Sequence, residues 1–200
     1  MVADFKIEAE LWSQGYHRVA GIDEAGRGPL AGPVAVAALI LPPDPRLEQK
    51  LLGGVRDSKC MTPAQRRKWA EVLRQIALTW SVAFASPQEI DSLGIQEAVY
   101  LATRRALAGL SLPPDHLILD YFRLPECPYP QQSYIHGDAL SLSIAGASIL
   151  AKTARDDLMG QLDARYPGYG FASHKGYGTA AHLQALQHLG PCPIHRRSFA

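Results

Sequence analysis

Four acidic side chains follow short apolar runs, and their type suits the binding of a hard metal ion. Asp23 and Glu24 follow VAGI, Asp120 follows LIL, and Asp138 follows YIHG. An all-oxygen ligand set favours Mg²⁺ or Mn²⁺. Two such ions about 4 Å apart can activate a water molecule and stabilise the leaving oxygen of a phosphodiester. The sequence therefore predicts a hydrolytic two-ion site, provided that the ends of these strands meet at one edge of a sheet.

The individual acids leave alternatives open. Neighbouring residues of a strand point to opposite faces, so Asp23 and Glu24 can share a site only if their strand ends or bulges between them. Asp138 taken alone also suits a surface turn or a helix cap. Asp120 ends a hydrophobic strand, where a buried charge requires a compensating partner.

The stretch GIDEAGRGPLAG (21–32) places Arg27 between two glycines directly after the first acids. Residues 26–31 formally match the dinucleotide pattern G-x-G-x-x-A, but that pattern requires a helix to follow. Here Pro33 and a strand-like apolar run follow. A simple tight turn explains the glycines but neither the acids nor the arginine. Because glycines also expose backbone N–H groups, we interpret the loop as part of a ligand site.

Periodicity and capping residues predict the elements that position these groups. Strands are expected at 17–23, 32–41, 78–85, 115–120 and 133–138. Helices are expected at 5–15, 62–77, 94–110, 141–166 and 179–190, with a further helix start at 86–90. Loops are expected at 42–59 and 167–178. This order predicts an α/β fold, with a mixed β-sheet flanked by helices and a helical C-terminal appendage.

Composition narrows the class of protein. The 200 residues, of which 47% are apolar and 20% charged, indicate one globular domain that needs no disulfides. Cys60, Cys127 and Cys192 are widely spaced and form no C-x-x-C motif, which favours the reducing cytoplasm. The longest apolar run, 34–41, is far shorter than the ~20 residues that span a bilayer, and the N-terminal segment lacks a signal-peptide pattern. No membrane association is expected.

The net charge of +1 does not by itself indicate a nucleic-acid-binding protein. The basic residues are nevertheless clustered, and they matter if the fold gathers several clusters on one side. These clusters are 66–68, 104–105, Lys152 with Arg155, 174–175 and 195–197. Four histidines show no metal-ligand spacing and are predicted to have capping, surface or packing roles; they are His174, His182, His188 and His195.

Several long motifs, in order along the chain, resemble the ribonuclease HII family. GIDEAGRGPLAGPV resembles its D-E-x-G-R-G signature, and RDSK (56–59) resembles its D-S-K element. GDALSLSIAGASILAKTARDDLM, YPGYGFASHKGYGTAAH and GPCPIHRRSF are similar to its C-terminal motifs. The resemblance extends from about residue 19 to Phe199. It implies an RNase H-like fold and a single catalytic domain over 1–200, with a loop and helical C-terminal extension from about 160 to 200.

The resemblance implies an endoribonuclease that hydrolyses the RNA strand of RNA–DNA hybrids. It also implies incision 5′ of single ribonucleotides in duplex DNA, as in ribonucleotide excision repair, leaving 5′-phosphate and 3′-hydroxyl ends. Asp23, Glu24, Asp120 and Asp138 match the family's metal-binding acids, which hold two Mg²⁺ or Mn²⁺ ions during catalysis. We expect a cytoplasmic monomer; the sequence does not indicate whether a sliding clamp is a partner.

The resemblance also implies a set of substrate contacts. Gly26, Arg27 and Gly28 match the loop that recognises the ribose 2′-hydroxyl, the group that distinguishes RNA from DNA. Tyr177 matches a tyrosine that packs on the sugar after the ribonucleotide. Positions near the backbone phosphates are polar or basic in the family; here they are Ser58, Lys59, Lys152 and Arg155.

Two positions depart from the family pattern. Tyr121 follows the third acid, where the family often has glycine, so the local turn is in question. His136 stands two residues before the fourth acid, where lysine is frequent. A histidine is only partly charged at neutral pH. If that position contacts phosphate, binding is therefore expected to be weaker and more dependent on pH.

Three alternatives are less well supported. Ribonuclease HIII, a sister family, carries a sizeable N-terminal substrate-binding domain, whereas 22 residues precede Asp23 here. A non-catalytic nucleic-acid-binding module does not explain the acids, because acids that bind no ion repel phosphates. A dinucleotide-binding enzyme requires the helix that the glycine loop lacks.

Overall fold

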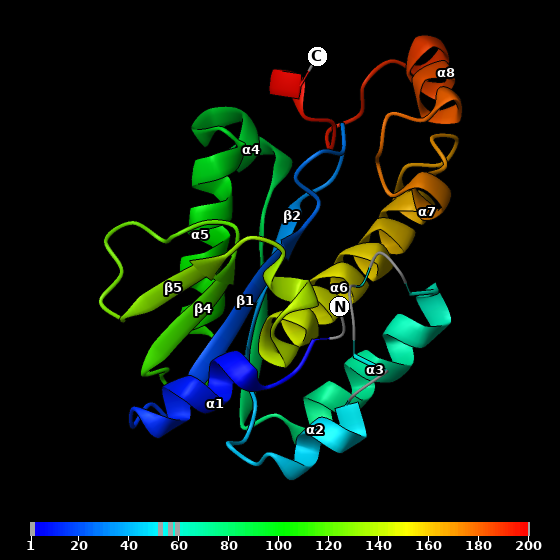
Figure 1. Ribbon diagram of the computed structural model, residues 1–200. Coiled ribbons are helices and arrows are strands. Elements are labelled where there is room, and N and C mark those ends of the chain that lie inside the picture. Colours follow the sequence, from blue (N-terminus) through cyan, green and yellow to red (C-terminus); the bar gives the residue numbers. More distant parts are fainter. Residues whose placement is uncertain (1–2, 52–53, 56–57, 59–60, 200) are drawn as a thin grey trace.

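Five strands form one mixed sheet in the computed structural model, which describes residues 3–51, 54–55, 58 and 61–199 (Figure 1). The strands are β1 (Val19–Ala25), β2 (Val34–Ile40), β3 (Thr79–Ala85), β4 (His116–Asp120) and β5 (Gln131–Tyr134). Their order across the sheet is β3-β2-β1-β4-β5. The β1–β2 and β2–β3 pairs are antiparallel, whereas β1–β4 and β4–β5 are parallel. The predicted mixed α/β sheet is confirmed.

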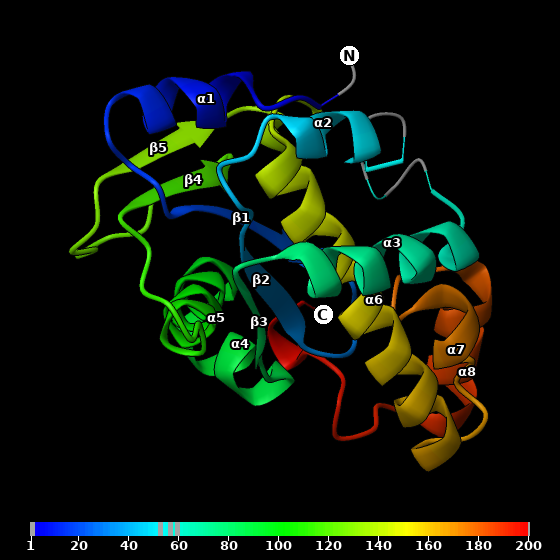
Figure 2. The ribbon, with the colours of Figure 1, turned by 90° about the horizontal axis from the view of Figure 1, so that it is seen from below.

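Helices cover both faces of the sheet (Figure 2). The α-helices are α1 (Lys6–Ser13), α2 (Arg46–Leu51), α3 (Pro63–Ile76), α4 (Pro87–Leu93), α5 (Ile95–Ala108), α6 (Leu142–Arg165), α7 (Phe171–His174) and α8 (Ala180–Leu189). Two short 3₁₀ helices are η2 (Gly137–Ala139) and η3 (Arg197–Phe199). Helix α6 packs on β1 and β2 with α3 outside it, and α5 packs on the opposite face against β2 and β3. None of the described helices is both long and apolar enough to cross a membrane.

The predicted capping residues act as expected. The Thr62 hydroxyl accepts the N–H of Gln65 at 3.2 Å, and the Gln65 side chain accepts the N–H of Thr62 at 2.9 Å. The same capping box begins α4 at Ser86 and Glu89. Such boxes satisfy backbone donors that the first turn of a helix leaves unpaired. They explain why these helix starts could be predicted from the sequence.

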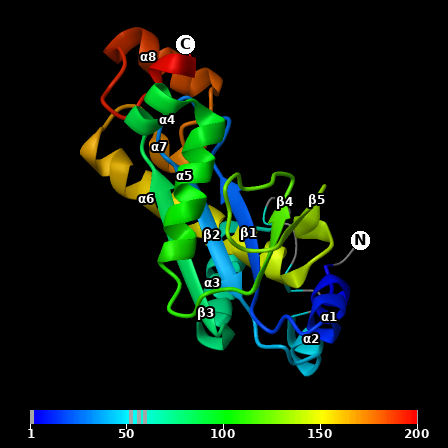
Figure 3. The ribbon, with the colours of Figure 1, turned by 90° about the vertical axis from the view of Figure 1, so that its left-hand side faces the viewer.

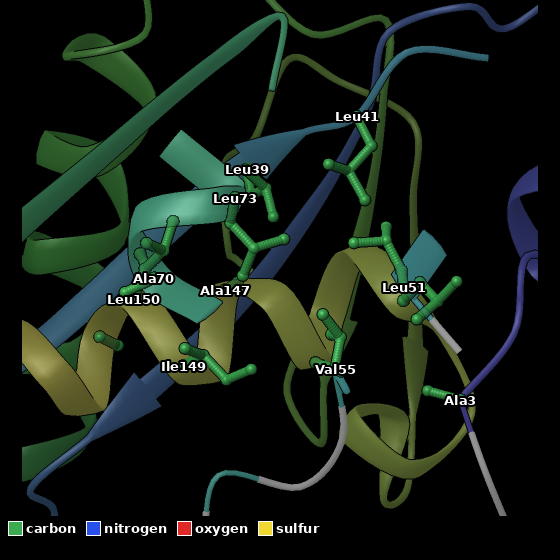
Figure 4. Close-up of a cluster of buried hydrophobic side chains, with 14 of the residues drawn as sticks. Ala3, Leu39, Leu41, Leu51, Val55, Ala70, Leu73, Ala147, Ile149 and Leu150 are labelled. Atoms are coloured by element: carbon green, nitrogen blue, oxygen red, sulfur yellow. The ribbon is translucent and has the colours of Figure 1, made fainter. Parts of the chain in front are cut away.

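The buried strand β2 separates two apolar clusters. Leu39 packs against Leu73 of α3 and the small-residue face of α6 (Figure 4). Ile40, one residue further, belongs to the cluster beneath α5. At Gly21 of β1, any Cβ would collide with the backbone of Ser143 in α6. This close contact of strand and helix fixes the position of α6 relative to the end of β1.

Several expected boundaries were wrong. Strand β5 ends at Tyr134, because His136 has a φ of 58° and turns the chain into η2; Asp138 therefore lies on a 3₁₀ turn. The expected loops at 42–59 and 167–178 contain α2 and α7. In β3 the expected alternation of buried and exposed side chains is not followed, because Trp80, which was expected on the buried face, is 37% exposed. An edge strand places fewer side chains against a helix than β2 does.

The chain after α6 forms the predicted helical appendage. Helices α7 and α8 and the C-terminal segment lie at the end of the molecule where α4 is found (Figures 1 and 3). Phe171, Tyr169 and Ile194 pack with Met159 of α6 in a separate apolar cluster. The segment also returns to the glycine loop, because Ala31 pairs with His195 in an isolated β-bridge. The appendage therefore contacts the loop that the sequence interpreted as a ligand site.

Candidate active site

Parallel pairing brings Asp23 and Asp120 to the same edge of the sheet. Ile22 of β1 is in register with Leu119 of β4, so the acid that follows each is at the same level. The backbone N–H of Gly137 donates to Asp120 Oδ1 at 2.7 Å. This bond holds η2, which carries the buried Asp138, against the end of β4.

Asp23 and Glu24 share a site without the expected end or bulge of the strand. Strand β1 continues to Ala25, with regular pairing to β2. Asp23 is 5% exposed, and its Oδ1 accepts the N–H of Glu24 at 2.7 Å. Both residues nevertheless line one cavity. The cavity is therefore lined by two neighbours on a strand that neither ends nor bulges between them.

The electrostatics of this edge are unfavourable for an anion. Burial, followed by the negative charges of Glu24 and Asp120, raises the pKa of Asp23 well above its ordinary value; a hydrogen bond from Ser148 acts in the opposite direction. Arg27 Nη1 lies 3.3 Å from Glu24 Oε1 and balances part of the charge. The combined carboxylates form an oxygen-donor set whose repulsion a divalent cation would relieve.

This donor set fits Mg²⁺ or Mn²⁺ by its chemistry. Among the described residues, however, no three acids, histidines or cysteines are gathered closely enough to hold an ion. Asp23, Glu24 and Asp120 are the residues whose charges already act on one another.

We expect Mg²⁺ or Mn²⁺ to raise the melting temperature of the protein. Folding raises the pKa of Asp23, so ionising this carboxyl costs stability as the pH rises from its unfolded pKa through its folded pKa, and a cation bound to the ionised carboxylates offsets that cost. An ion at 100 times its Kd adds about 2.7 kcal/mol, or roughly 5–10 °C for a chain of this size. Thermal unfolding at pH 7.5 with and without each metal measures the shift. An equal shift in an Asp23→Asn, Asp120→Asn double variant would contradict binding at this edge.

The glycine loop forms a wall of the cavity at Asp23, whose volume is about 210 Å³. Gly26 has a φ of +97°, and a Cβ there would collide with the Arg155 side chain, so only glycine fits. A Cβ on Gly28 would lie 4.0 Å from Tyr177 Cε1, which places that half-exposed ring beside the loop. The cavity thus joins Asp23 and Glu24 to the loop and Tyr177, whereas Asp120 and Asp138 are not among its lining residues; the lining comprises residues 23–28, Ser58, Ser148, Lys152 and Tyr177.

Arg155 has a different role from the predicted phosphate contact. Its side chain is fully buried, and its guanidinium donates to the carbonyls of Pro33 at 2.9 Å, Lys175 at 3.0 Å and Ala31 at 3.2 Å. Buried carbonyls are strong acceptors that must be satisfied. Arg155 therefore ties the glycine loop to the loop before Tyr177, and its buried side chain has no surface exposed for a phosphate in this conformation.

Arg196 is the functional residue that sequence reasoning missed. It is 3% exposed and donates to the carbonyls of Gly26 at 2.6 Å, Arg27 at 2.8 Å and Gly32 at 2.9 Å. Burial, with Arg155 close by, lowers its pKa to about 9. The sequence showed only a basic cluster at 195–197. Nothing local indicated that this cluster returns beneath the glycine loop.

The other residues that the sequence singled out near the substrate lie in different environments. Lys152 lines the cavity and donates to Asp156 Oδ1 at 2.6 Å, while burial lowers its pKa. The Ser58 hydroxyl is buried, 2.9 Å from the Ser148 hydroxyl. Lys59 lies outside the described residues. Tyr121 has a φ of +66°, and its side chain is 71% exposed. The positive φ is a physical reason for glycine to be frequent at this position.

A second cavity of about 320 Å³ adjoins the first, because Lys152 and Tyr177 line both. Arg67 and Lys175 contribute positive charge to it. Two acids, Asp156 and Asp157, also line it and pair with arginines. The basic clusters that the sequence showed at 66–68, 152 and 174–175 are thus gathered on one side.

The chain matches one known protein family over most of its length. The family model described as Ribonuclease HII matches residues 20–200. The chain belongs to the ribonuclease HII family. A ribonuclease HII of Anaeromyxobacter sp. (strain Fw109-5) is 55% identical over 97% of this chain, and one of Myxococcus xanthus (strain DK1622) is 54% identical over 98%. The chain spans 60% and 65% of the lengths of these two relatives.

Solved structures of the ribonuclease HII type share the fold. The ribonuclease H2 from Pyrococcus horikoshii OT3 has a TM-score of 0.75 at 28% identity, covering 90% of this chain and 93% of its own. An RNase HII from Archaeoglobus fulgidus, solved in a complex with PCNA, has a TM-score of 0.77 at 25% identity, covering 92% and 95%. Bst-RNase HIII, solved in complex with Mn²⁺, shares the fold with a TM-score of 0.69 at 20% identity, covering 92% and 67%. The RNase H-like fold is confirmed.

Proposed function

We propose that the chain is a metal-dependent endoribonuclease. It hydrolyses the RNA strand of RNA–DNA hybrids and incises 5′ of single ribonucleotides in duplex DNA. The observation that carries the proposal is one cavity lined by Asp23 and Glu24, the 26–28 loop and Tyr177, with Asp120 at the same strand edge. The family of the chain and the gathered basic side chains support it.

The acids would hold the metal. Asp23, Glu24, Asp120 and Asp138 supply the oxygen ligands for two Mg²⁺ or Mn²⁺ ions. When bound, such ions lower the pKa of the attacking water and stabilise the departing 3′-oxygen. The neighbour solved with Mn²⁺ is consistent with this chemistry. The products have 5′-phosphate and 3′-hydroxyl ends.

The glycine loop and Tyr177 provide recognition of the ribonucleotide. Backbone groups of Gly26, Arg27 and Gly28 bind the ribose 2′-hydroxyl, and the Tyr177 ring packs on the next sugar. Because the ring lies beside Gly28, both contacts can act on adjacent nucleotides. Arg155 and Arg196 donate five hydrogen bonds to backbone carbonyls of residues 26–33 and one to the Lys175 carbonyl, which fixes the glycine loop and ties it to the loop before Tyr177.

The second cavity would bind the nucleic-acid backbone beyond the site. Lys152 lies between the two cavities, with Arg67 and Lys175 further along. Phosphates bind at such clustered cations with strong salt dependence. Ser58 and Lys59 are further proposed phosphate neighbours. We further propose that the enzyme acts as a monomer in the cytoplasm, the compartment that its cysteine usage favours.

Cleavage of three labelled duplexes tests the function. One duplex is all DNA with a single ribonucleotide, one is an RNA–DNA hybrid, and one contains only DNA. We expect cleavage of the first two, 5′ of the single ribonucleotide in the first, and an intact DNA duplex. Mapping the product ends on a sequencing gel measures the position. Binding without cleavage in both Mg²⁺ and Mn²⁺ would instead support the nucleic-acid-binding module.

A further inference from the structure

A cluster of three histidine rings lies behind Tyr177, and neither the metal site nor the phosphate path uses it. His174 and His182 are stacked with ring centroids 4.5 Å apart. His182 Nε2 lies 3.0 Å from His195 Nε2. His182 is fully buried and His195 is 7% exposed. The predicted packing role of these histidines is confirmed, but their hydrogen bonds allow a more specific conclusion.

The hydrogen bonds assign the protons on His182 and His195. The Tyr177 carbonyl can only accept, so His182 Nδ1, 2.9 Å away, must carry a proton. In a neutral ring, His182 Nε2 is then an acceptor, and His195 Nε2 must donate to it. His195 Nδ1 is left as an acceptor, and the N–H of Cys192 points at it from 2.9 Å. The Tyr177 carbonyl at one end of this series of hydrogen bonds and the Cys192 N–H at the other end require the same positions for the protons.

His174 is assigned in the same way. The N–H of Gly176 donates to its Nδ1 at 3.2 Å, so the proton is on Nε2, which lies 2.7 Å from the Tyr169 carbonyl. The N–H of Tyr177 donates to the His174 carbonyl at 3.0 Å. The backbone on both sides of Tyr177 is therefore held by neutral imidazoles.

The relay Cys192–His195–His182 is built from neutral rings. His195 Nδ1 also lies 3.3 Å from the Cys192 carbonyl and 3.2 Å from its Sγ, so Cys192 surrounds that nitrogen. Burial lowers the pKa of both His182 and His195. Within the described residues, no acidic side chain is a ring contact or a hydrogen-bond partner of the three histidines. The titratable or charged groups nearby are Tyr169, Cys192, Lys175, Arg155 and Arg196.

We propose that the relay Cys192–His195–His182 is a positioning device that holds Tyr177 in place for ribonucleotide recognition. The inference rests on the proposed contact of Tyr177 with the substrate sugar. His182 touches no substrate and acts through the Tyr177 backbone, because its Nδ1 proton is donated to the Tyr177 carbonyl.

A double-mutant cycle tests the coupling. We compare kcat/KM at pH 8 on the single-ribonucleotide duplex for the unaltered protein, Tyr177→Ala, His182→Ala and the double variant. Loss of a hydrogen bond that orients the ring lowers kcat/KM by about 5–10-fold. If His182 acts through Tyr177, the double variant matches Tyr177→Ala. If the losses in kcat/KM of the two single variants instead multiplied in the double variant, the inference would be overturned. No effect of Tyr177→Ala would instead refute the proposed function of that ring.

Rescue by a variant that keeps the donor tests the bond itself. His182→Asn retains an N–H near the Nδ1 position, so at pH 8 it should keep more of kcat/KM than His182→Ala does. His188→Asn, an exposed histidine on the same helix, is the matched control and should leave kcat/KM unchanged. If His182→Asn lost as much as His182→Ala, the bond to the Tyr177 carbonyl would not be what positions the ring.

Nitrogen-15 NMR of the unaltered protein tests the relay even if the variants do not fold. Histidine-labelled protein at pH 7.5 should show His182 protonated at Nδ1 and His195 protonated at Nε2, each with a pKa below about 6.5. The opposite tautomers, or a charged ring at pH 7.5, would overturn the assignment independently of any activity.

Discussion

Replacing Asp120 by asparagine is expected to reduce cleavage of a ribonucleotide-containing duplex by a factor on the order of 10³ or more, in Mg²⁺ and in Mn²⁺. The amide retains an oxygen that can accept the N–H of Gly137, so the η2 turn stays against β4. The change removes one negative charge from the edge where Asp23 and Glu24 already repel each other. The variant should therefore fold at least as well as the unaltered protein while losing a metal ligand.

Single-turnover kinetics with saturating enzyme separates this loss from weaker substrate binding. Glu10→Gln on α1 is the matched control, because Glu10 is an exposed acid outside the cavity. It should cleave at the normal rate. If Asp120→Asn cleaved within a few-fold of the normal rate in Mg²⁺, Asp120 would not be a metal ligand and the proposed site would have to be rebuilt around other acids.

The sequence predicted the elements that are specified locally. Thr62 with Gln65 and Ser86 with Glu89 satisfy the first turns of their own helices, so these starts depend on few distant contacts. Convergence of Asp23 and Asp120 followed from the parallel pairing that an α/β order implies. Asp138 was placed at a strand end because His136 gave no sign that it would adopt a left-handed conformation.

The role of the buried arginines could not be predicted in the same way. A motif shows which side chain is present but not where it points. Arg155 and Arg196 lie far apart in the sequence, and both end beneath one loop because the C-terminal segment returns to it. That return depends on the packing of Phe171, Tyr169 and Met159, which is a tertiary property. Arg155 was therefore assigned to phosphate, and Arg196 was left without a role.

Replacing Arg155 by methionine is expected to destabilise the protein strongly. Methionine keeps most of the apolar stem but leaves the carbonyls of Ala31, Pro33 and Lys175 without the guanidinium. An unsatisfied buried polar group costs about 1–3 kcal/mol, so three should lower the free energy of unfolding by at least about 3 kcal/mol. For a chain of this size that is roughly 6–12 °C in melting temperature. Arg155→Lys should not rescue it, because one ammonium group does not reproduce the planar guanidinium fork.

The control separates a structural arginine from one that contacts phosphate. Arg67 is largely exposed, and its side chain pairs with Asp157 at 2.9 Å. Exposed pairs contribute about 1 kcal/mol or less, so Arg67→Met should unfold almost normally. If Arg67 binds a phosphate, the same variant should make the salt dependence of duplex binding shallower by about one unit of slope. The opposite pattern, normal stability of Arg155→Met with a shallower salt dependence, would return Arg155 to the substrate-binding surface, because removing a fully buried arginine that contacts no phosphate leaves the number of released counterions unchanged.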